Sequence, residues 1–405
     1  MSEVKKISIS DYTYELPAER IALHPLPVRD ASKLLIYHDG NISEDIYENI
    51  AEHLPSKSLL VFNNTKVIRA RIKFQKPTGG VIEIFCLEPY EDVNEYSTIM
   101  NKKGSVKWKC MIGGASKWKE NSLQLTVGSW QLNARLTEKL SDAYVVEFSW
   151  QPPGMTFAEV IDTAGDIPLP PYIKRDTDIE DKTRYQTIYA KDEGSVAAPT
   201  AGLHFTEDIF QGLSEKNIQT DFITLHVGAG TFKPVKSATM QDHEMHAEWI
   251  DVSREFIQRL THNFDKTVVA VGTTSLRTIE SLYWMGLKVH VDPSIKQITV
   301  NQWEVYESPL NETELSTSDA LNALIEWMKR NEQDRIFTQT QILIAPGYKF
   351  RIAKALVTNF HQPQSTLLLL VAAAIGKDWR TVYQYAMEND FRFLSYGDGS
   401  LLFMV

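Results

Sequence analysis

Five of the ten histidines lie inside or beside runs of small and polar residues, where a side chain can meet a ligand: His204, His226, His243, His246 and His361. An imidazole gains or loses a proton near neutral pH, so it can serve as a general acid or base. The pattern indicates acid, base or hydrogen-bonding roles for some of these histidines. A purely structural role is the alternative for each one taken singly.

His243, His246 and Glu248 form the pattern H-x-x-H-x-E, which raises the possibility of a metal site. The spacing matches neither the helical zinc-protease pattern nor a structural site built on cysteine. We therefore expect no bound metal.

Two runs built almost entirely from small residues follow one another in the chain. Residues 194–206 read GSVAAPTAGLHFT and residues 224–232 read TLHVGAGTF, and neither run contains Asp, Glu, Lys or Arg. Small residues let the backbone approach a ligand closely, so the runs predict a pocket. Two tight structural turns are the alternative.

Basic side chains are concentrated near residue 70 although the chain as a whole is acidic. If residues 69–73 form a strand, Arg69, Arg71 and Lys73 share one face. Such a row of cations could contact phosphates.

Residues 102–119 add six lysines, among them Lys107 and Lys109, with Trp108 and Trp118 interleaved and no acidic residue. Cations that hold phosphates and aromatic rings that stack on bases would suit an RNA-facing surface. The favoured alternative is a solvated sheet face with both tryptophans in the core.

The segments that must position these residues are of two kinds: one part of the chain alternates strand and helix patterns, and the other is rich in β-strand patterns. Residues 71–155 alternate short β-type runs with glycine turns and end at Pro152, Pro153 and Gly154, which predicts a small inserted β-barrel domain. Residues 1–70 and 156–405 alternate strand and helix patterns, which predicts one discontinuous, mixed-sheet α/β catalytic domain.

One strand-to-helix junction is especially clear. Residues 267–271 are mostly β-branched and end at Gly272, and Thr273 and Thr274 then offer helix caps before an apolar pattern that stops at Gly286. Backbone N–H groups at such a junction can hold an anion or a hydroxyl-rich ligand. Residues 319–329 show apolar side chains at helical spacing, which predicts a helix with a core-facing stripe.

The overall composition excludes several classes of protein. The chain has 405 residues and a net charge of −10, so any nucleic-acid binding must depend on a local patch. There is no nucleophile elbow and no phosphate-binding loop, and Lys233 stands where a dinucleotide fingerprint starting at Gly228 needs its third glycine. With two cysteines and no signal or membrane-spanning segment, we expect a cytoplasmic protein with no membrane association.

The motifs resemble those of the S-adenosylmethionine:tRNA ribosyltransferase-isomerases of queuosine biosynthesis along nearly the whole chain. Besides the two small-residue runs, the resemblance rests on these segments: HPLPVRD at 24–30, PLPPYI at 168–173, YQTIYA at 185–190, AVGTTSLRTIES at 270–281, TNFHQPQSTL at 358–367 and FRFLSYGD at 391–398. The family fold that this implies is likewise an α/β domain with an inserted β-barrel.

The resemblance implies that the ribosyl part of S-adenosylmethionine is transferred to 7-aminomethyl-7-deazaguanine at the wobble position of tRNAs with a GUN anticodon, and is isomerised there. Methionine and adenine leave, and epoxyqueuosine is the product. S-adenosylmethionine is then a substrate, and no cofactor is needed. We also expect a monomer.

With this chemistry in view, the motif positions suggest roles for individual residues. The candidate acids and bases are His204, His226, His246 and Glu248. The candidate substrate-binding residues, among which Arg277 could hold a carboxylate in two parallel hydrogen bonds, are Thr200, Gly202, Gly228, Gly230, Thr273, Thr274, Arg277, His361 and Asp398. The candidate tRNA contacts are Arg69, Arg71, Lys73, Lys107 and Lys109.

Two other functions stay open beside this one. Gln364 stands where the family usually has lysine, and the barrel segment 112–119 also departs from the family pattern, which would suit an enzyme that uses S-adenosylmethionine with a different acceptor. A catalytically silent RNA- or nucleoside-binding protein on the same fold is the other alternative, although the intact histidine and glycine motifs argue against it.

Overall fold

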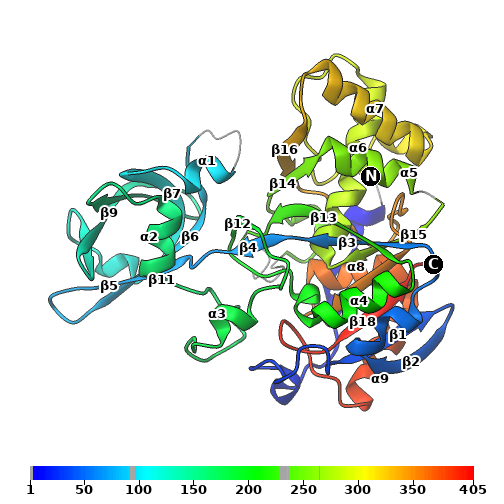
Figure 1. The fold of residues 1–405 in the computed structure, drawn as a ribbon, viewed down its shortest axis with the longest axis horizontal. Helices are drawn as coiled ribbons and strands as arrows, with labels where there is room; N and C mark the ends of the chain where they lie inside the picture. The colour runs from blue at the N-terminus through cyan, green and yellow to red at the C-terminus, as the bar shows by residue number, and fades with distance from the viewer. Residues whose placement is uncertain (1–2, 92–95, 229–234, 236, 264) are drawn as a thin grey trace.

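The computed structural model describes residues 3–91, 96–228, 235, 237–263 and 265–405. A large body with a nine-stranded sheet lies beside a smaller one with a seven-stranded sheet (Figure 1). The large sheet is mixed and carries helices, whereas every strand pair of the small sheet is antiparallel. The prediction of a mixed-sheet α/β fold with a separate small β unit is confirmed.

The large sheet brings together strands from both ends of the chain. Its four central strands, β13, β3, β15 and β17, run parallel to one another. The strand order across the sheet is β16 (Arg335–Thr340), β14 (Glu248–Ser253), β13 (Gln219–His226), β3 (Ser58–Asn63), β15 (Thr267–Val271), β17 (Ala355–Asn359), β18 (Gly399–Phe403), β1 (Lys33–His38) and β2 (Asn41–Ile46).

Both faces of the large sheet are buried at its centre. In β3, Leu59 and Val61 belong to one hydrophobic cluster while Leu60 and Phe62 belong to another, because successive side chains of a strand point to opposite faces. A continuous apolar strand is what a sheet covered on both sides requires.

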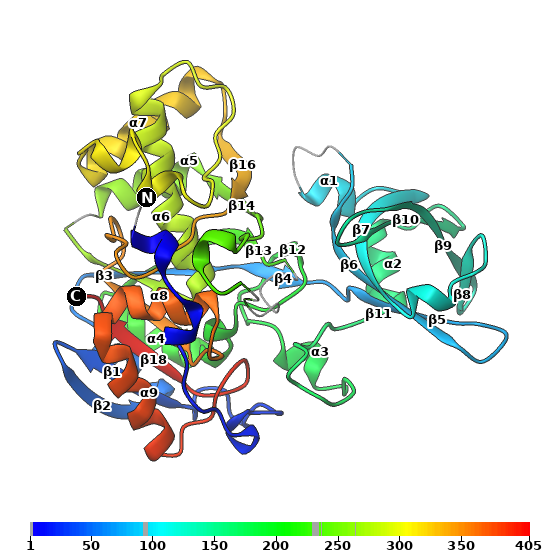
Figure 2. The same cartoon turned by 180° about the vertical axis from the view of Figure 1, so that it is seen from behind.

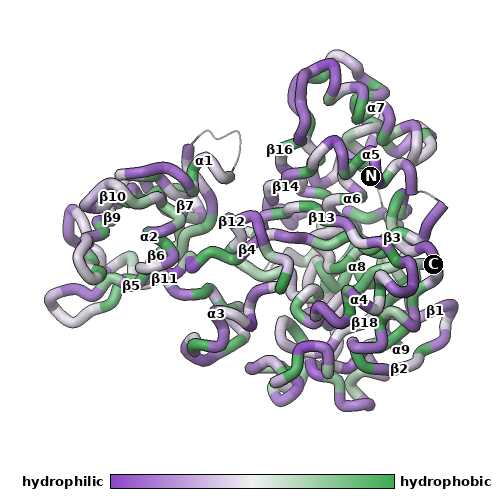
Figure 3. The backbone as a smooth tube through the Cα atoms, in the orientation of Figure 1, coloured by the Kyte–Doolittle hydropathy of each residue, from purple (hydrophilic) through white to green (hydrophobic). Residues whose placement is uncertain are grey.

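Helices supply the cover on each face. Helices α5 (Arg254–His262), α6 (Thr273–Val291) and α7 (Thr317–Arg330) pack on the face of Leu59, and α4 (Glu207–Glu215) packs on the opposite face. Helix α8 (Thr366–Ile375), which is strongly apolar in Figure 3, packs with α9 (Trp379–Glu388) over β1. No helix in the described part of the chain is both long and apolar enough to cross a bilayer.

Helix α6 is longer than the sequence pattern predicted. It continues past Gly286 to Val291, so the prediction that it stops at this glycine is wrong. A Cβ atom at Gly286 would lie 2.0 Å from the carbonyl oxygen of Ala320 in α7. The glycine lets two helices cross closely instead of ending one of them. The predicted core stripe of α7 is confirmed, since Leu321, Leu324 and Met328 are buried.

The small sheet is curled into a half-barrel around its own core. Trp108 and Trp118 lie in that core together with Phe157 of α2 (Phe157–Ala164). The interpretation that these two rings stack on bases is therefore wrong, and the alternative that both belong to the core is confirmed. The strand order is β11 (Gly165–Asp166), β5 (Arg71–Gln75), β6 (Val81–Pro89), β7 (Ser105–Gly113), β10 (Tyr144–Gln151), β9 (Trp130–Lys139) and β8 (Leu123–Val127).

The chain leaves the large sheet after β3 and returns to it at β13. On the way out it forms β4 (Thr65–Val67), and on the way back it forms α3 (Asp181–Arg184) and β12 (Asp192–Ser195), which pairs with β4 in parallel. Figure 2 shows these connections from behind. Helix α1 (Tyr96–Met100) of the small body contacts β12, and the predicted domain limits at residues 70 and 156 stay a prediction.

Candidate active site

The four parallel strands of the large sheet end at the same edge, where polar residues follow them. Asn63 ends β3, His226 ends β13, and Asn359 ends β17, while β15 leads through Gly272 into α6. The crevice beyond the carboxyl ends of parallel strands is the usual place for a ligand in open α/β sheets. The strand order thus predicts where the site should lie, and cavities are found there.

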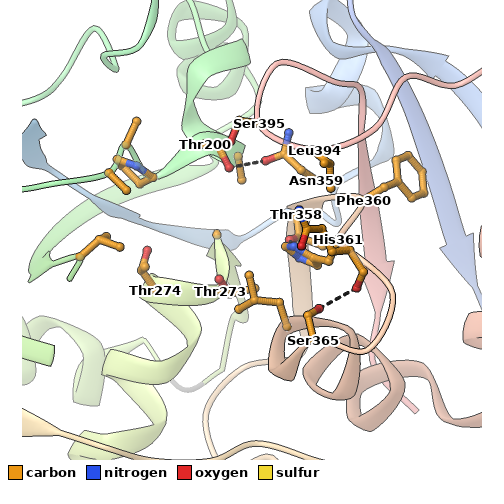
Figure 4. A pocket seen from close by; sticks show the side chains of 18 of the residues that line it. Thr200, Thr273, Thr274, Thr358, Asn359, Phe360, His361, Ser365, Leu394 and Ser395 are labelled. Atoms are coloured by element: carbon orange, nitrogen blue, oxygen red, sulfur yellow. Dashed lines mark hydrogen bonds between the residues drawn. The ribbon is translucent and has the colours of Figure 1, made fainter. Parts of the chain in front are cut away.

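The first cavity lies between the start of α6 and the segment that follows β17 (Figure 4). The described parts of both small-residue runs meet in its wall, through Ala197 to Ala201 and through Val227. None of its lining residues is Asp, Glu, Lys or Arg. Its polar lining is made of hydroxyl, amide and imidazole side chains: Tyr172, Tyr185, Thr200, Thr273, Thr274, Thr358, Asn359, His361, Gln362, Gln364, Ser365 and Ser395.

A second cavity adjoins the first at Thr273, Thr274 and Leu367, which line both. It runs along α6 to Arg277 and is closed on one side by Ile342, Leu343 and Ile344. The remaining lining residues are His243, Met245, His246, Glu248, Thr366 and Leu370.

A wider hollow separates the two bodies of the structure. His246 and Glu248 line it together with the second cavity, and Val227 lines it together with the first. Lys109 comes to it from the small sheet. The first two cavities therefore share the amino end of α6, and the hollow adjoins the first at Val227 and the second at His246 and Glu248.

His226 lies at the wall of this hollow and is 5% exposed. Its Nδ1 is 3.1 Å from the Thr65 hydroxyl, and its ring packs against Tyr96 of the small body at 4.3 Å between centroids. Burial lowers the pKa of His226 to about 4. The side chain is neutral at physiological pH and can accept a proton.

His204 lies behind the first cavity instead of in its wall. Its ring stacks on Tyr47 at 4.2 Å, and its Nε2 is 3.4 Å from the side-chain nitrogen of Asn359. Asn359 in turn accepts a hydrogen bond of 2.8 Å from Thr200, and both of these residues line the cavity. Burial lowers the pKa of His204 to about 3. The geometry makes His204 a support for Asn359.

His361 lines the first cavity, and burial lowers its pKa to about 4. Its Nε2 is 2.8 Å from the hydroxyl of Thr358. In Figure 4 its ring points into the cavity, whereas the ring of the neighbouring Phe360 points away.

Arg277 and Glu248 form a buried ion pair through Nη1 in the second cavity. The Nε of Arg277 donates to the carbonyl of Ile342 at 3.2 Å. Its Nη2 is buried and has no hydrogen-bond partner among the described residues. No group of three or more His, Cys, Asp or Glu side chains in those residues could hold a metal ion.

Two of the described predicted substrate-binding residues, Gly202 and Asp398, are not in the walls of these cavities. Gly202 lies where a Cβ would be 1.9 Å from the hydroxyl of Tyr189, so it permits close packing. Asp398 is buried and accepts hydrogen bonds from the backbone of Lys33 and from Arg392. Gly230 falls outside the described residues, whereas Gly228 lines the hollow between the bodies.

The predicted tRNA contacts lie on or beside the small sheet, and most are paired with carboxylates. Strand β5 begins at Arg71, so Arg69 precedes the strand, and Arg71 and Lys73 share a face. Ion pairs join Arg69 to Asp162, Arg71 to Glu83, Lys73 to Asp166 and Lys109 to Glu88. The exposed side chain of Lys107 lies on β7.

Asn359 is a cavity residue that the sequence analysis missed. It joins Thr200 to His204 and follows the apolar run of β17 directly. A polar residue at the carboxyl end of a buried parallel strand was the signal that could have identified it.

Comparison with known proteins shows which family the chain belongs to. The sequence model of the family described as "Queuosine biosynthesis protein" matches residues 9–402. The S-adenosylmethionine:tRNA ribosyltransferase-isomerase of Halothermothrix orenii is 36% identical over 98% of this chain and 100% of its own length. The protein of the same name from Thermotoga petrophila is 35% identical over 98% of this chain and 100% of its own length.

Among solved structures, the S-adenosylmethionine tRNA ribosyltransferase of Thermotoga maritima is 26% identical to this chain. The match covers 97% of this chain and 99% of the other, with a TM-score of 0.46. The sequence matches span nearly the whole length of the protein and include every strand end that forms the cavities. The chain belongs to the family of queuosine biosynthesis proteins.

Proposed function

We propose that the protein is an S-adenosylmethionine:tRNA ribosyltransferase-isomerase. It transfers the ribosyl part of S-adenosylmethionine to 7-aminomethyl-7-deazaguanine at the tRNA wobble position and isomerises it to the epoxycyclopentanediol of epoxyqueuosine. Methionine and adenine leave. The names of the relatives support the reaction, and the cavities supply residues for it.

The observation that carries the proposal is the uncharged lining of the first cavity. Hydroxyl and amide side chains there can pair with ribose hydroxyls and with the edges of a base. The absence of carboxylates from this lining also suits a sulfonium substrate, since a tight ion pair would stabilise the cation before it reacts. The ribosyl and adenine parts of the substrate would occupy this space.

The reaction begins with removal of a proton from the carbon beside the sulfonium, and His226 is the candidate that the geometry favours as the base. The Thr65 hydroxyl can donate to the carbonyl of Asp192 at 3.4 Å and accept from Nδ1–H of His226. Nε2 then carries the lone pair that accepts the proton. His246 and Glu248, which line the same hollow, stay the other candidate acids and bases.

The tRNA would enter through the hollow between the two bodies, where the wobble base could reach the first cavity past Val227. Lys109 lines this entrance, and the other predicted tRNA contacts lie on or beside the same small sheet. We propose tRNAs with a GUN anticodon as substrates, a monomeric enzyme, and no cofactor besides the S-adenosylmethionine that is consumed.

The test is to incubate the protein with S-adenosylmethionine and a tRNA carrying the aminomethyl-deazaguanine, then to digest the tRNA and determine the masses of its nucleosides. We expect epoxyqueuosine, with one adenine and one methionine released for each nucleoside formed. Adenine release without a modified nucleoside would instead indicate another acceptor. Binding of S-adenosylmethionine without any turnover would indicate a silent binding protein.

A further inference from the structure

One nitrogen of the Arg277 guanidinium in the second cavity has no partner in the part of the chain that the structure describes. Arg277 is 7% exposed, and its Nη2 has no hydrogen-bond partner within the described residues. A buried donor without a partner lowers stability, so one that lines a cavity needs a partner that the cavity can admit, such as a water, an ion or a ligand. The other two nitrogens, Nη1 and Nε, are held by Glu248 and by the carbonyl of Ile342, which fixes the side chain at the cavity wall.

The same cavity also contains the amino end of α6, which is 19 residues long. Its N-cap residue is Gly272, which has no side chain that could bond to the first N–H groups of the helix. The first hydrogen bond of the helix is donated by the N–H of Leu276 to the carbonyl of Gly272. The N–H groups of Thr273 and Thr274 precede that bond, so they have no partner within the helix. A helix start and a buried guanidinium at one cavity together favour an anion.

The rest of the wall identifies the kind of anion. Met245, Ile342, Ile344 and Leu370 are apolar, so the ligand carries its charge on an aliphatic body. Glu248 places a carboxylate beside the guanidinium, which suits a ligand that also carries a positive charge. An α-amino acid with an aliphatic side chain has these features.

We propose that the second cavity binds the methionyl end of S-adenosylmethionine, with its α-carboxylate at Nη2 of Arg277 and the first turn of α6. This inference rests on the proposed function. Because Thr273, Thr274 and Leu367 line both cavities, one substrate can extend across them, with its ribosyl part in the first cavity. Methionine then leaves from a subsite separate from that of adenine.

The test compares two unreactive ligands on the unmodified protein by calorimetry. S-adenosylhomocysteine has the carboxylate, and its decarboxylated analogue lacks only that group. We expect the analogue to bind about 10- to 100-fold more weakly, as a charge-assisted hydrogen bond is lost. The carboxylate of Glu248 repels the carboxylate of the ligand, so loss of the ligand's carboxylate would strengthen binding if that repulsion dominated. Weaker binding of the analogue would therefore indicate that the carboxylate contacts Arg277.

Arg277→Lys extends the test, because lysine keeps the positive charge beside Glu248 but has no second nitrogen for the ligand. We expect the difference between the two ligands to fall below about threefold in this variant. Arg335→Lys is the matched control: Arg335 pairs with Asp251, which lies on β14 with Glu248, and it lines neither of the two cavities proposed for the substrate. This control should keep the full difference.

Equal affinities of the two ligands for the unmodified protein would overturn the inference. If the protein still forms epoxyqueuosine, only the methionyl subsite is wrong and the proposed function stands. If neither ligand binds and no nucleoside forms, both proposals fail.

Discussion

Burial determines what the individual histidines of this site can do. His226 and His204 both have a lowered pKa, because the protein interior disfavours the imidazolium ion. They differ in position, since His226 lines a hollow while His204 lies behind Asn359. A neutral imidazole at the wall of the hollow can exchange a proton with a ligand, whereas His204 contacts Asn359 and is placed to orient that amide.

Replacement of His226 should therefore affect the chemical step directly. His226→Gln keeps an amide that can bond Thr65 but cannot act as a base, and we expect single-turnover ribosyl transfer to slow by about 10²- to 10⁴-fold. Affinity for S-adenosylhomocysteine should change little. His290→Gln, at an exposed position of α6, should have the unmodified rate. An unchanged rate in His226→Gln would remove this residue from the candidate bases.

At the scale of elements, glycines that look like pocket residues or helix stops in the sequence are explained by packing. Gly286 accommodates Ala320 of α7, and Gly202 accommodates the hydroxyl of Tyr189. Strand β15 and the core stripe of α7 were predictable because periodicity and β-branching are local signals. The partners of these glycines come from other segments, so the local pattern could not reveal why glycine is there.

The helix crossing gives a prediction with an internal control. Gly286→Ala places a methyl group against a backbone carbonyl at 2.0 Å, so α6 and α7 must move apart. We expect the free energy of unfolding to fall by about 1–3 kcal/mol or more, measured by urea denaturation. Gly212→Ala in α4 meets nothing within 4 Å and should stabilise the protein by about 0.5–1 kcal/mol. If both substitutions changed the free energy of unfolding equally, α6 and α7 would not be in close contact at Gly286.

The exposed face of β7 gives a prediction for tRNA binding. If Lys107 contacts a phosphate, Lys107→Ala should weaken binding and reduce the slope of log affinity against log salt concentration by about 1. Lys329→Ala, at an exposed position of α7, is the control and should leave the slope unchanged. Filter-binding titrations at several salt concentrations measure both. An unchanged slope for Lys107→Ala would place the phosphates elsewhere.

At the scale of the whole molecule, the site depends on two bodies that meet at one edge of the large sheet. Tyr96 of the small body packs on His226, and Gly194 allows this contact because a Cβ there would lie 2.4 Å from the ring of Tyr96. The sequence predicted both bodies from their different periodicities. It could not predict which residues face each other across the hollow, because that depends on how β4 and β12 direct the connecting chain.

Two buried histidines of the large body, His204 and His226, and the partly buried His361 make its stability depend on pH. The pKa values of His226 and His361 are lowered to about 4 and that of His204 to about 3, against about 6.5 in an unfolded chain. Between these values the unfolded chain binds more protons, so stability is complete above about pH 6.5 and is lost as the pH falls towards 4.

A variant that lacks one of these histidines should lose less stability on acidification than the unmodified protein. His361→Gln cannot be protonated, so we expect its free energy of unfolding to fall less between pH 7 and pH 5 than that of the unmodified protein, by on the order of 2 kcal/mol. Urea denaturation at the two pH values measures this difference. Carboxylates titrate mostly below this window, and the exposed His290→Gln variant should keep the unmodified pH dependence. If His361→Gln loses as much stability as the unmodified protein, the fold does not lower the pKa of His361, and this prediction is wrong.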